Sequence, residues 1–321
     1  MGDRTENIIR IRDYVGIARP DHWLKNAFML PGAAMAFIID DRVQLTAAAF
    51  LVAGIIATCL LASANYTINE YLDGKFDRHH PTKSSRPAAQ GKIRLDLMLT
   101  QYVILAGAGL AIASQLNPVF FLASLLLLFM GIVYNVEPLR TKDRVFLDVL
   151  SESVNNPIRL ILGWAAITTI VMPPSSLLIC YWAGGAYLMT VKRYAEYRMI
   201  ADAERAGQYR KSFRHYTEQS LLLAAFFYAL TSVFFLAIFL IKYRIEFVIS
   251  FPFFAFLFVW YLKIASQPTS LAINPEKIYR NRAFLIYVGF LTLLMAGLFF
   301  IDLPALEFLI DHNVAEDFRL E

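Results

Sequence analysis

The sequence has 321 residues, of which 58% are hydrophobic and only 17% are charged, and its mean hydropathy is +0.50. This composition excludes an ordinary soluble globular protein, and the long apolar runs indicate a chain that crosses a lipid bilayer several times. The formal net charge is only +4, so the placement of the charges carries more information than their sum, and we expect no nucleic-acid partner.

Nine apolar segments predict an all-α fold, a single membrane-embedded domain over residues 1–321 that forms a bundle of nine transmembrane helices. Helices are the expected spanning element because irregular backbone cannot face lipid. We expect residues 1–22 to form a cytoplasmic juxtamembrane segment and residues 302–321 to form an extracytoplasmic tail. The predicted spans are 23–39, 45–72, 95–115, 118–135, 146–170, 174–197, 217–241, 246–264 and 283–301.

The connections between these segments differ in charge. Four of them, after the second, fourth, sixth and eighth segments, are rich in lysine and arginine, whereas the opposite connections are short and nearly uncharged. The positive-inside rule therefore places the N-terminus and the basic connections in the cytoplasm and the C-terminus outside, as expected for a multi-pass protein of the inner (cytoplasmic) membrane. The sequence is compatible with assembly into a homo-oligomer.

Acidic and basic residues are concentrated between residues 65 and 92, at the end of the second segment. Asn69, Asp73 and Asp77 are spaced i, i+4, i+8, with Glu70 beside the first, which places them on one face if the helix continues. Hard oxygen ligands of this kind suit Mg²⁺, which proteins usually hold with one or two carboxylates plus substrate phosphates. The stretch therefore predicts a magnesium-diphosphate site, with a solvated juxtamembrane loop as the alternative.

Basic residues follow directly: Lys83 and Arg86 are expected to bind phosphate oxygens. Three further polar sets fall on the same predicted side of the membrane, where ionisable groups are functional candidates. These sets are Tyr134, Arg140 and Lys142 after the fourth segment; Asp148, Glu152, Asn155 and Arg159 on the fifth, with Pro157 interrupting the register; and Lys192 with Glu196 on the sixth.

Each set also has a structural interpretation. Lys192 and Glu196 are i, i+4 and are compatible with a simple helix-end ion pair. Asp148, Glu152 and Arg159 are compatible with a buried network between helices, and Arg140 and Lys142 with ordinary positive-inside charges. The polar segment 198–216 is expected to form a short surface helix or cap.

Several of these motifs resemble the UbiA superfamily of intramembrane prenyltransferases. Its first signature, NDxxDxxxD, is present with Glu70 in place of the first aspartate, and its second, DxxxD, is replaced here by Lys192-x-x-x-Glu196. The branch of decaprenyl-phosphate phosphoribosyltransferases is the most similar. That similarity includes RPDHWLKN at 19–26, the run from Asp77 to Gly91, Lys192-Arg-Tyr-Ala-Glu, and Arg159 followed by Gly163.

The resemblance implies a UbiA-type fold and transfer from phosphoribosyl diphosphate to a polyprenyl phosphate lipid. In this hypothesis Mg²⁺ bridges the donor diphosphate to the catalytic residues Asn69, Asp73 and Asp77, with Glu70 in support. Lys25, Arg159 and Lys192 are expected to bind the 5-phosphate and the lipid phosphate, without a further assignment among them. These substrates carry more phosphate than a prenyl diphosphate, and Lys192 supplies an additional fixed cation where the superfamily has an acid.

Two other functions are compatible with parts of the pattern. Transfer of a prenyl group from its diphosphate to an aromatic acceptor predicts turnover without a ribosyl donor. A transporter or channel predicts polar residues near the midplane of several helices, whereas the polar residues here crowd one predicted face of the membrane.

Overall fold

The computed structural model describes residues 10–40, 46–79, 83–200, 202–267, 270–273 and 281–309, and within these ranges all regular structure is helical. The α-helices are α1 (Ile11–Ala18), α2 (Leu30–Ile39), α3 (Ala47–Asp77), α4 (Leu95–Leu116), α5 (Pro118–Asn135), α6 (Leu147–Ser153), α7 (Asn155–Ala165), α8 (Ser175–Ile200), α9 (Ala203–Tyr209), α10 (Glu218–Tyr243), α11 (Phe251–Ala265) and α12 (Arg282–Phe300). Short 3₁₀ helices join them: η1 (Pro20–Met29), η2 (Lys83–Ser85), η3 (Thr141–Asp143), η4 (Lys211–Arg214), η5 (Ile245–Ser250), η6 (Leu271–Ile273) and η8 (Pro304–Leu309).

The prediction of an all-α, multi-pass membrane protein is confirmed. Six helical stretches are long and apolar enough to cross a membrane: α3, α4, α5, α10, η5 with α11, and α12. The other three predicted spans fall on η1 with α2, on α6 with α7, and on α8, which are helical. The count of nine spans therefore stays a prediction. Most of the predicted tail, from residue 310 onward, and residues 1–9 lie outside the described ranges.

The fifth predicted span is divided near its middle. α6 ends at Ser153 and α7 begins at Asn155, four and two residues before Pro157. Proline lacks a backbone N–H, and its ring collides with the carbonyl of the residue four positions earlier, which is Ser153. The interruption therefore lies one turn before the proline, and it separates Asp148 on α6 from Arg159 on α7.

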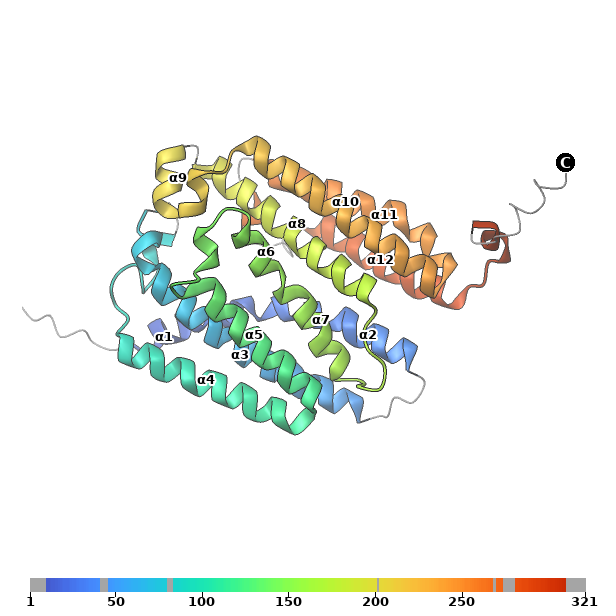
Figure 1. Ribbon diagram of the computed structural model, residues 1–321, viewed down its shortest axis with the longest axis horizontal. Coiled ribbons are helices and arrows are strands. Elements are labelled where there is room, and N and C mark those ends of the chain that lie inside the picture. The colour runs from blue at the N-terminus through green and yellow to red at the C-terminus, as the bar shows by residue number, and fades with distance from the viewer. Residues whose placement is uncertain are drawn as a thin grey trace, which may run out of the picture.

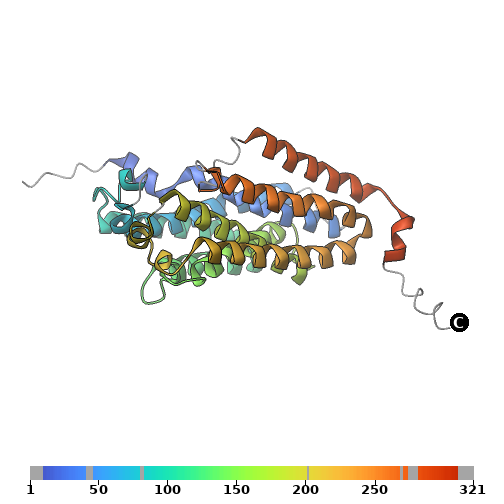
Figure 2. The same ribbon diagram turned by 90° about the horizontal axis from the view of Figure 1, so that it is seen from above.

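The long helices run side by side, and the charged connections gather at one end (Figure 1). α9 lies at this end and contacts both α3 and α8, so we refer to it as the α9 end. α8 packs along α10, and α3 packs along α4 and α5. Figure 2 shows α12 at the edge of the bundle. The predicted helix within 198–216 is present as α9, followed by η4.

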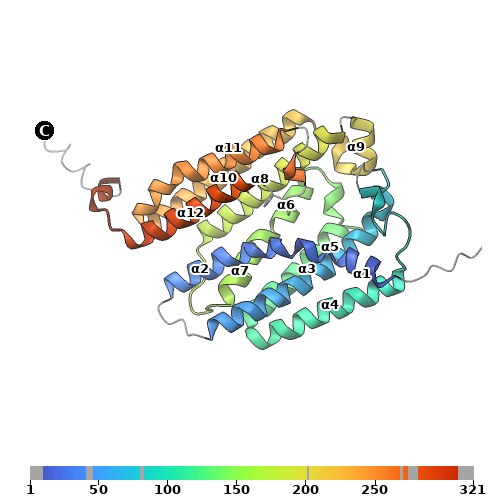
Figure 3. The same ribbon diagram turned by 180° about the vertical axis from the view of Figure 1, so that it is seen from behind.

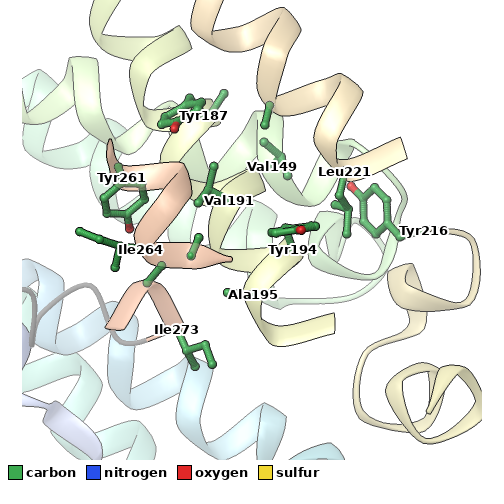
Figure 4. Close-up of a cluster of buried hydrophobic side chains, with 14 of the residues drawn as sticks. Val149, Tyr187, Val191, Tyr194, Ala195, Tyr216, Leu221, Tyr261, Ile264 and Ile273 are labelled. Carbon is green, nitrogen blue, oxygen red and sulfur yellow. The ribbon is translucent and has the colours of Figure 1, made fainter. Parts of the chain in front are cut away.

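Each half of the bundle contains an apolar cluster. One lies among α3, α4, α5 and α7 and includes Leu61, Phe120 and Leu162. The other joins α8 to α10 and α11, where Tyr187, Val191 and Tyr194 face Leu221, Tyr261 and Ile264 (Figure 4).

Outward-facing side chains of the peripheral helices stay apolar. Val103 of α4, Leu223 of α10 and Leu293 of α12 are 65%, 62% and 74% exposed. Large aliphatic side chains this exposed are unfavourable in water but are matched to lipid, so these faces are the bilayer-facing surface of the bundle.

A close crossing in the interior depends on two glycines. α2 and η1 cross α7 (Figure 3), and a Cβ added at Gly32 would collide with the carbonyl oxygen of Leu160. A Cβ added at Gly163 would collide in the same way with the carbonyl oxygen of Met29. The two backbones approach this closely because both positions lack a side chain. This crossing sets the position of Arg159 relative to η1.

We expect Gly163→Ala to destabilise the bundle because the new methyl group has to displace the Met29 backbone, an overpacking cost of about 1–3 kcal/mol. Gly289→Ala is the matched control, since a Cβ there meets nothing within 4 Å and alanine is the better helix former. Thermal unfolding of the two detergent-solubilised variants checks this. Equal melting temperatures would contradict the packing interpretation.

Candidate active site

The predicted acidic face of α3 is formed at the α9 end. The Asp73 carboxylate lies 2.5 Å from the Lys142 Nζ and 3.3 Å from the Arg140 guanidinium. The Lys142 ammonium also donates to the Asn69 amide oxygen at 3.5 Å, and Arg86 donates to the Asp77 carboxylate at 2.8 Å. Residues from α3, η2 and η3 are therefore brought together here, as the sequence predicted.

Glu70 is turned toward different partners. It is only 2% exposed and forms an ion pair with Arg19, while Arg86 lies 3.5 Å from the same carboxylate oxygen. Arg19 is the C-cap of α1 and was not among the predicted site residues. Its only sequence signal is its place at the start of the RPDHWLKN motif. The Glu70 carboxylate is thus engaged by two guanidinium groups, and its support of a metal stays a prediction.

The described residues contain no group of three or more His, Cys, Asp or Glu side chains arranged to hold a metal ion. The chemistry of the α3 face nevertheless fits Mg²⁺, because one or two carboxylates suffice when substrate phosphates complete the shell. Asp73 and Asp77 supply two carboxylates, Asn69 supplies an amide oxygen, and the Asp73 side chain is 23% exposed.

A second charged group lies behind Lys83. The Lys83 ammonium donates to the Glu196 carboxylate at 2.9 Å and to the hydroxyl of Tyr209. Burial opposes the charged form of Lys83, but Glu196 and Tyr209 outweigh it, so the pKa of Lys83 is raised. Tyr209 belongs to α9, and no sequence pattern marked it. The simple Lys192–Glu196 ion pair considered above is not formed, because Glu196 pairs with Lys83 and Arg193 instead.

Asp148 and Tyr134 belong to the same buried group. Asp148 is fully buried and accepts hydrogen bonds from Arg193 at 3.2 Å and from Tyr216 at 2.7 Å. Arg193 also donates to the Tyr134 hydroxyl at 3.1 Å. Asp148 is therefore part of a network between helices, but Arg159 is not its partner. Its predicted contact with substrate stays a prediction.

Two predicted cations form no ion pair with an acid among the described residues. Arg159 donates through Nε to the amide oxygen of Asn26 at 3.1 Å and otherwise to a backbone carbonyl. Lys192 forms neither a hydrogen bond nor an ion pair within the described chain, although its charge interacts with those of Lys25 and Glu196. Half-buried cations without a carboxylate are favourable places for an anion.

Lys25 and Lys142 complete the predicted cations. Lys25 lies 3.2 Å from the Nδ1 of His22 and 5.9 Å from the centre of the Tyr66 ring. Burial lowers the pKa of Lys142 to about 8, although Asp73 favours its charged form. The site therefore combines acids on one helix with a larger number of lysine and arginine side chains around them.

A profile of the UbiA prenyltransferase family matches residues 28–281, most of the chain. The chain belongs to the UbiA prenyltransferase family. A UbiA homolog from Archaeoglobus fulgidus, solved bound to DMAPP and Mg²⁺, superposes with a TM-score of 0.67 at 20% identity, covering 90% of this chain and 100% of that one. This UbiA likeness identifies the fold alone.

Curated UbiA relatives are similar over part of their length. The decaprenyl-phosphate phosphoribosyltransferase of Mycobacterium tuberculosis is 32% identical over 207 residues, 63% of this chain and 65% of that protein. The enzyme of the same name from Mycolicibacterium smegmatis is 33% identical over 210 residues, 63% of this chain and 62% of that protein. The protoheme IX farnesyltransferase 1 of Bacillus subtilis is 28% identical over 142 residues, 43% of this chain and 44% of that protein. The chain thus spans less than two thirds of each relative.

Glu70→Ala should lower the melting temperature strongly, because it leaves the Arg19 guanidinium without a carboxylate in a largely buried position, while Arg86 keeps Asp77. Removing one partner of a buried ion pair costs about 3–5 kcal/mol. Asp96→Ala is the control, since the Arg94–Asp96 pair has side chains 53% and 60% exposed. We expect no measurable change for it in the same thermal-unfolding assay. A Glu70→Ala protein as stable as wild type would show that this pair is dispensable.

Proposed function

We propose that this protein transfers the 5-phosphoribosyl group of phosphoribosyl diphosphate to a polyprenyl phosphate, with release of diphosphate, in a Mg²⁺-dependent reaction. The observation that carries the proposal is the combination of an acidic α3 face with two cations, Arg159 and Lys192, that form no ion pair with an acid among the described residues. A ribosyl donor brings a diphosphate and a separate phosphate, and the lipid acceptor brings another. The similarity to the two phosphoribosyltransferases supports the same choice.

The α3 carboxylates and the cations next to them would exchange partners when the donor binds. Asp73 and Asp77, with Asn69, would hold Mg²⁺, and Glu70 would support them directly or through water. Bound Mg²⁺ would offset the charge that the leaving diphosphate acquires as its bond to the ribose breaks. Lys142, Arg140 and Arg86, which now pair with these acids, would donate to phosphate oxygens.

The remaining cations suit the other phosphates. Lys25 belongs to η1, Arg159 of α7 contacts η1 through Asn26, and Lys192 belongs to α8; the ion pairs of Asp73 and Asp77 involve other residues. They would hold the donor 5-phosphate and the lipid phosphate. The lipid phosphate is anionic at neutral pH, so its attack on the ribose needs no general base. Its isoprenoid tail would lie among the bilayer-facing helices.

The charge distribution supports a location in the inner membrane with the α9 end in the cytoplasm. Four basic connections are predicted on one side. In the described parts of the first three, Lys83 contacts Tyr209 of α9, Lys142 contacts Asp73 near the end of α3, and Arg210 directly follows α9. This orientation gives the site access to a soluble, highly charged ribosyl donor. Lys277 and Arg280 of the fourth connection lie outside the described residues.

Prenyl transfer to an aromatic acceptor is the second candidate. It is supported by the similarity to the protoheme IX farnesyltransferase and by the superfamily's α3 signature. Against it, the second acidic signature is replaced by Lys192 and Glu196, and Glu196 is already paired with Lys83 and Arg193.

The deciding assay incubates the purified protein with Mg²⁺, labelled phosphoribosyl diphosphate and polyprenyl phosphate. We expect a labelled lipid product. Asp73→Ala should abolish it by removing a carboxylate that holds the metal, and EDTA should abolish it by removing the metal itself. Asp96→Ala, at an exposed surface pair, is the control and should retain full activity. Product formation by Asp73→Ala or in EDTA would refute the metal assignment. Turnover only with a prenyl diphosphate and an aromatic acceptor would establish the second candidate.

Arg159→Met should raise the KM for a phosphate-bearing substrate by about tenfold or more, since a charge-assisted hydrogen bond contributes about 1.5–3 kcal/mol. Arg198→Met is the control, because Arg198 is 42% exposed and pairs only loosely with Glu218 at 3.7 Å. Steady-state kinetics with each substrate varied in turn identify which phosphate Arg159 binds. Unchanged KM values for both substrates would remove Arg159 from the site.

A further inference from the structure

Arg193 lies at the centre of the buried charge network, although no sequence pattern assigned it a role. It is only 1% exposed, yet all three nitrogens of its guanidinium find partners. Nε donates to the Asp148 carboxylate at 3.2 Å, Nη1 to the Glu196 carboxylate at 3.2 Å, and Nη2 to the Tyr134 hydroxyl at 3.1 Å. The planar guanidinium group of Arg193 thus links α5, α6 and α8.

Glu196 lies between Arg193 and the phosphate-binding lysines. Its Oε1 accepts from Lys83 at 2.9 Å and its Oε2 from Arg193 at 3.2 Å. Lys192 interacts with the same carboxylate through its charge. Any negative charge on Glu196 that Arg193 does not offset therefore reduces the positive potential at the ammonium groups of Lys83 and Lys192.

The bases of this network outnumber its acids. Two carboxylates, Asp148 and Glu196, are surrounded by the positive groups of Lys83, Lys192, Arg193 and Arg210. Both carboxylates are fully buried, where charges interact strongly because water is excluded. The excess positive charge is what attracts an anion, and Arg193 contributes to it without facing the α3 acids.

We propose that Arg193 is a positioning residue for the reaction proposed above: its guanidinium offsets the charges of Asp148 and Glu196, so that these acids do not weaken the hold of Lys83 and Lys192 on substrate phosphate. Arg193 acts through Glu196 and contacts no substrate itself. If it were lost, Glu196 would keep its charge and its hydrogen bonds from Lys83 and Tyr209, and that charge would oppose the incoming phosphate.

The test measures binding of inorganic diphosphate with Mg²⁺ to purified protein in lipid nanodiscs by calorimetry. Arg193→Met should raise the Kd about tenfold or more. Arg193→Lys keeps the charge but not the planar fork, so its Kd should lie between those of wild type and Arg193→Met. In the double variant Arg193→Met/Glu196→Gln the opposing charge is gone, so most of the lost affinity should return. A purely structural role predicts no such recovery.

Arg244→Met is the matched control, because Arg244 pairs with Glu246 at 3.2 Å beyond the C-terminal end of α10, away from the α9 end. It should leave the Kd unchanged. The inference is overturned if wild type does not bind diphosphate, if Arg193→Met binds like wild type, if Arg193→Lys is as weak as Arg193→Met, or if the double variant recovers nothing. If Arg193→Met cannot be purified as a monodisperse protein, the single variant Glu196→Gln tests the inference. A tenfold loss of diphosphate affinity in that variant would overturn it.

Because the readout is binding and not turnover, the two proposals fail separately. A wild-type protein that makes no ribosylated lipid but shows this pattern of diphosphate affinities overturns the proposed function and leaves the role of Arg193 in place. A protein that makes the lipid product but shows no recovery in the double variant keeps the proposed function and removes Arg193 from it.

Discussion

Compensation of buried charge at one end of an apolar bundle is the constraint on which this structure depends. Asp73, Asp77, Asp148 and Glu196 are largely removed from water, and each has a lysine or arginine within ion-pair distance. An isolated carboxylate in such a place would be strongly unfavourable. The pairs therefore make it possible for a membrane protein to carry this many acids beside its lipid-facing helices.

The same pairs hold the connections between helices in place. Lys83 of η2 reaches Glu196 of α8, Arg140 directly before η3 reaches Asp73 of α3, and Lys211 of η4 lies 3.0 Å from Asp143 of η3. Connections that would otherwise be loose surface loops are thus fixed against one another. Each of these contacts is an anion–cation pair. In the reaction proposed above, an anionic substrate with a divalent metal would compete for both partners, which would couple its binding to a rearrangement of these connections.

The interior of the bundle decides how these charges are spaced. The close crossing of α7 with η1 and α2, permitted by Gly32 and Gly163, brings Arg159 within hydrogen-bond distance of Asn26. The interruption before Pro157 turns Asp148 and Arg159 onto separate helices. Arg159 is thereby left without an ion pair in the described part of the chain, and Asp148 pairs with Arg193 instead, although Arg159 and Asp148 belong to the same predicted span.

The sequence by itself determined that the chain is a multi-pass bundle of apolar helices and that Asn69 and Asp73 share a face of α3, because hydrophobic runs and helical spacing are local properties of the chain. Only the tertiary structure decided which charges pair. Glu70 meets Arg19, 51 residues earlier, and Lys83 meets Glu196, 113 residues later. Such choices depend on how distant helices pack, and that packing also placed Arg193 at the centre of the network, where its neighbours along the chain gave no sign of it.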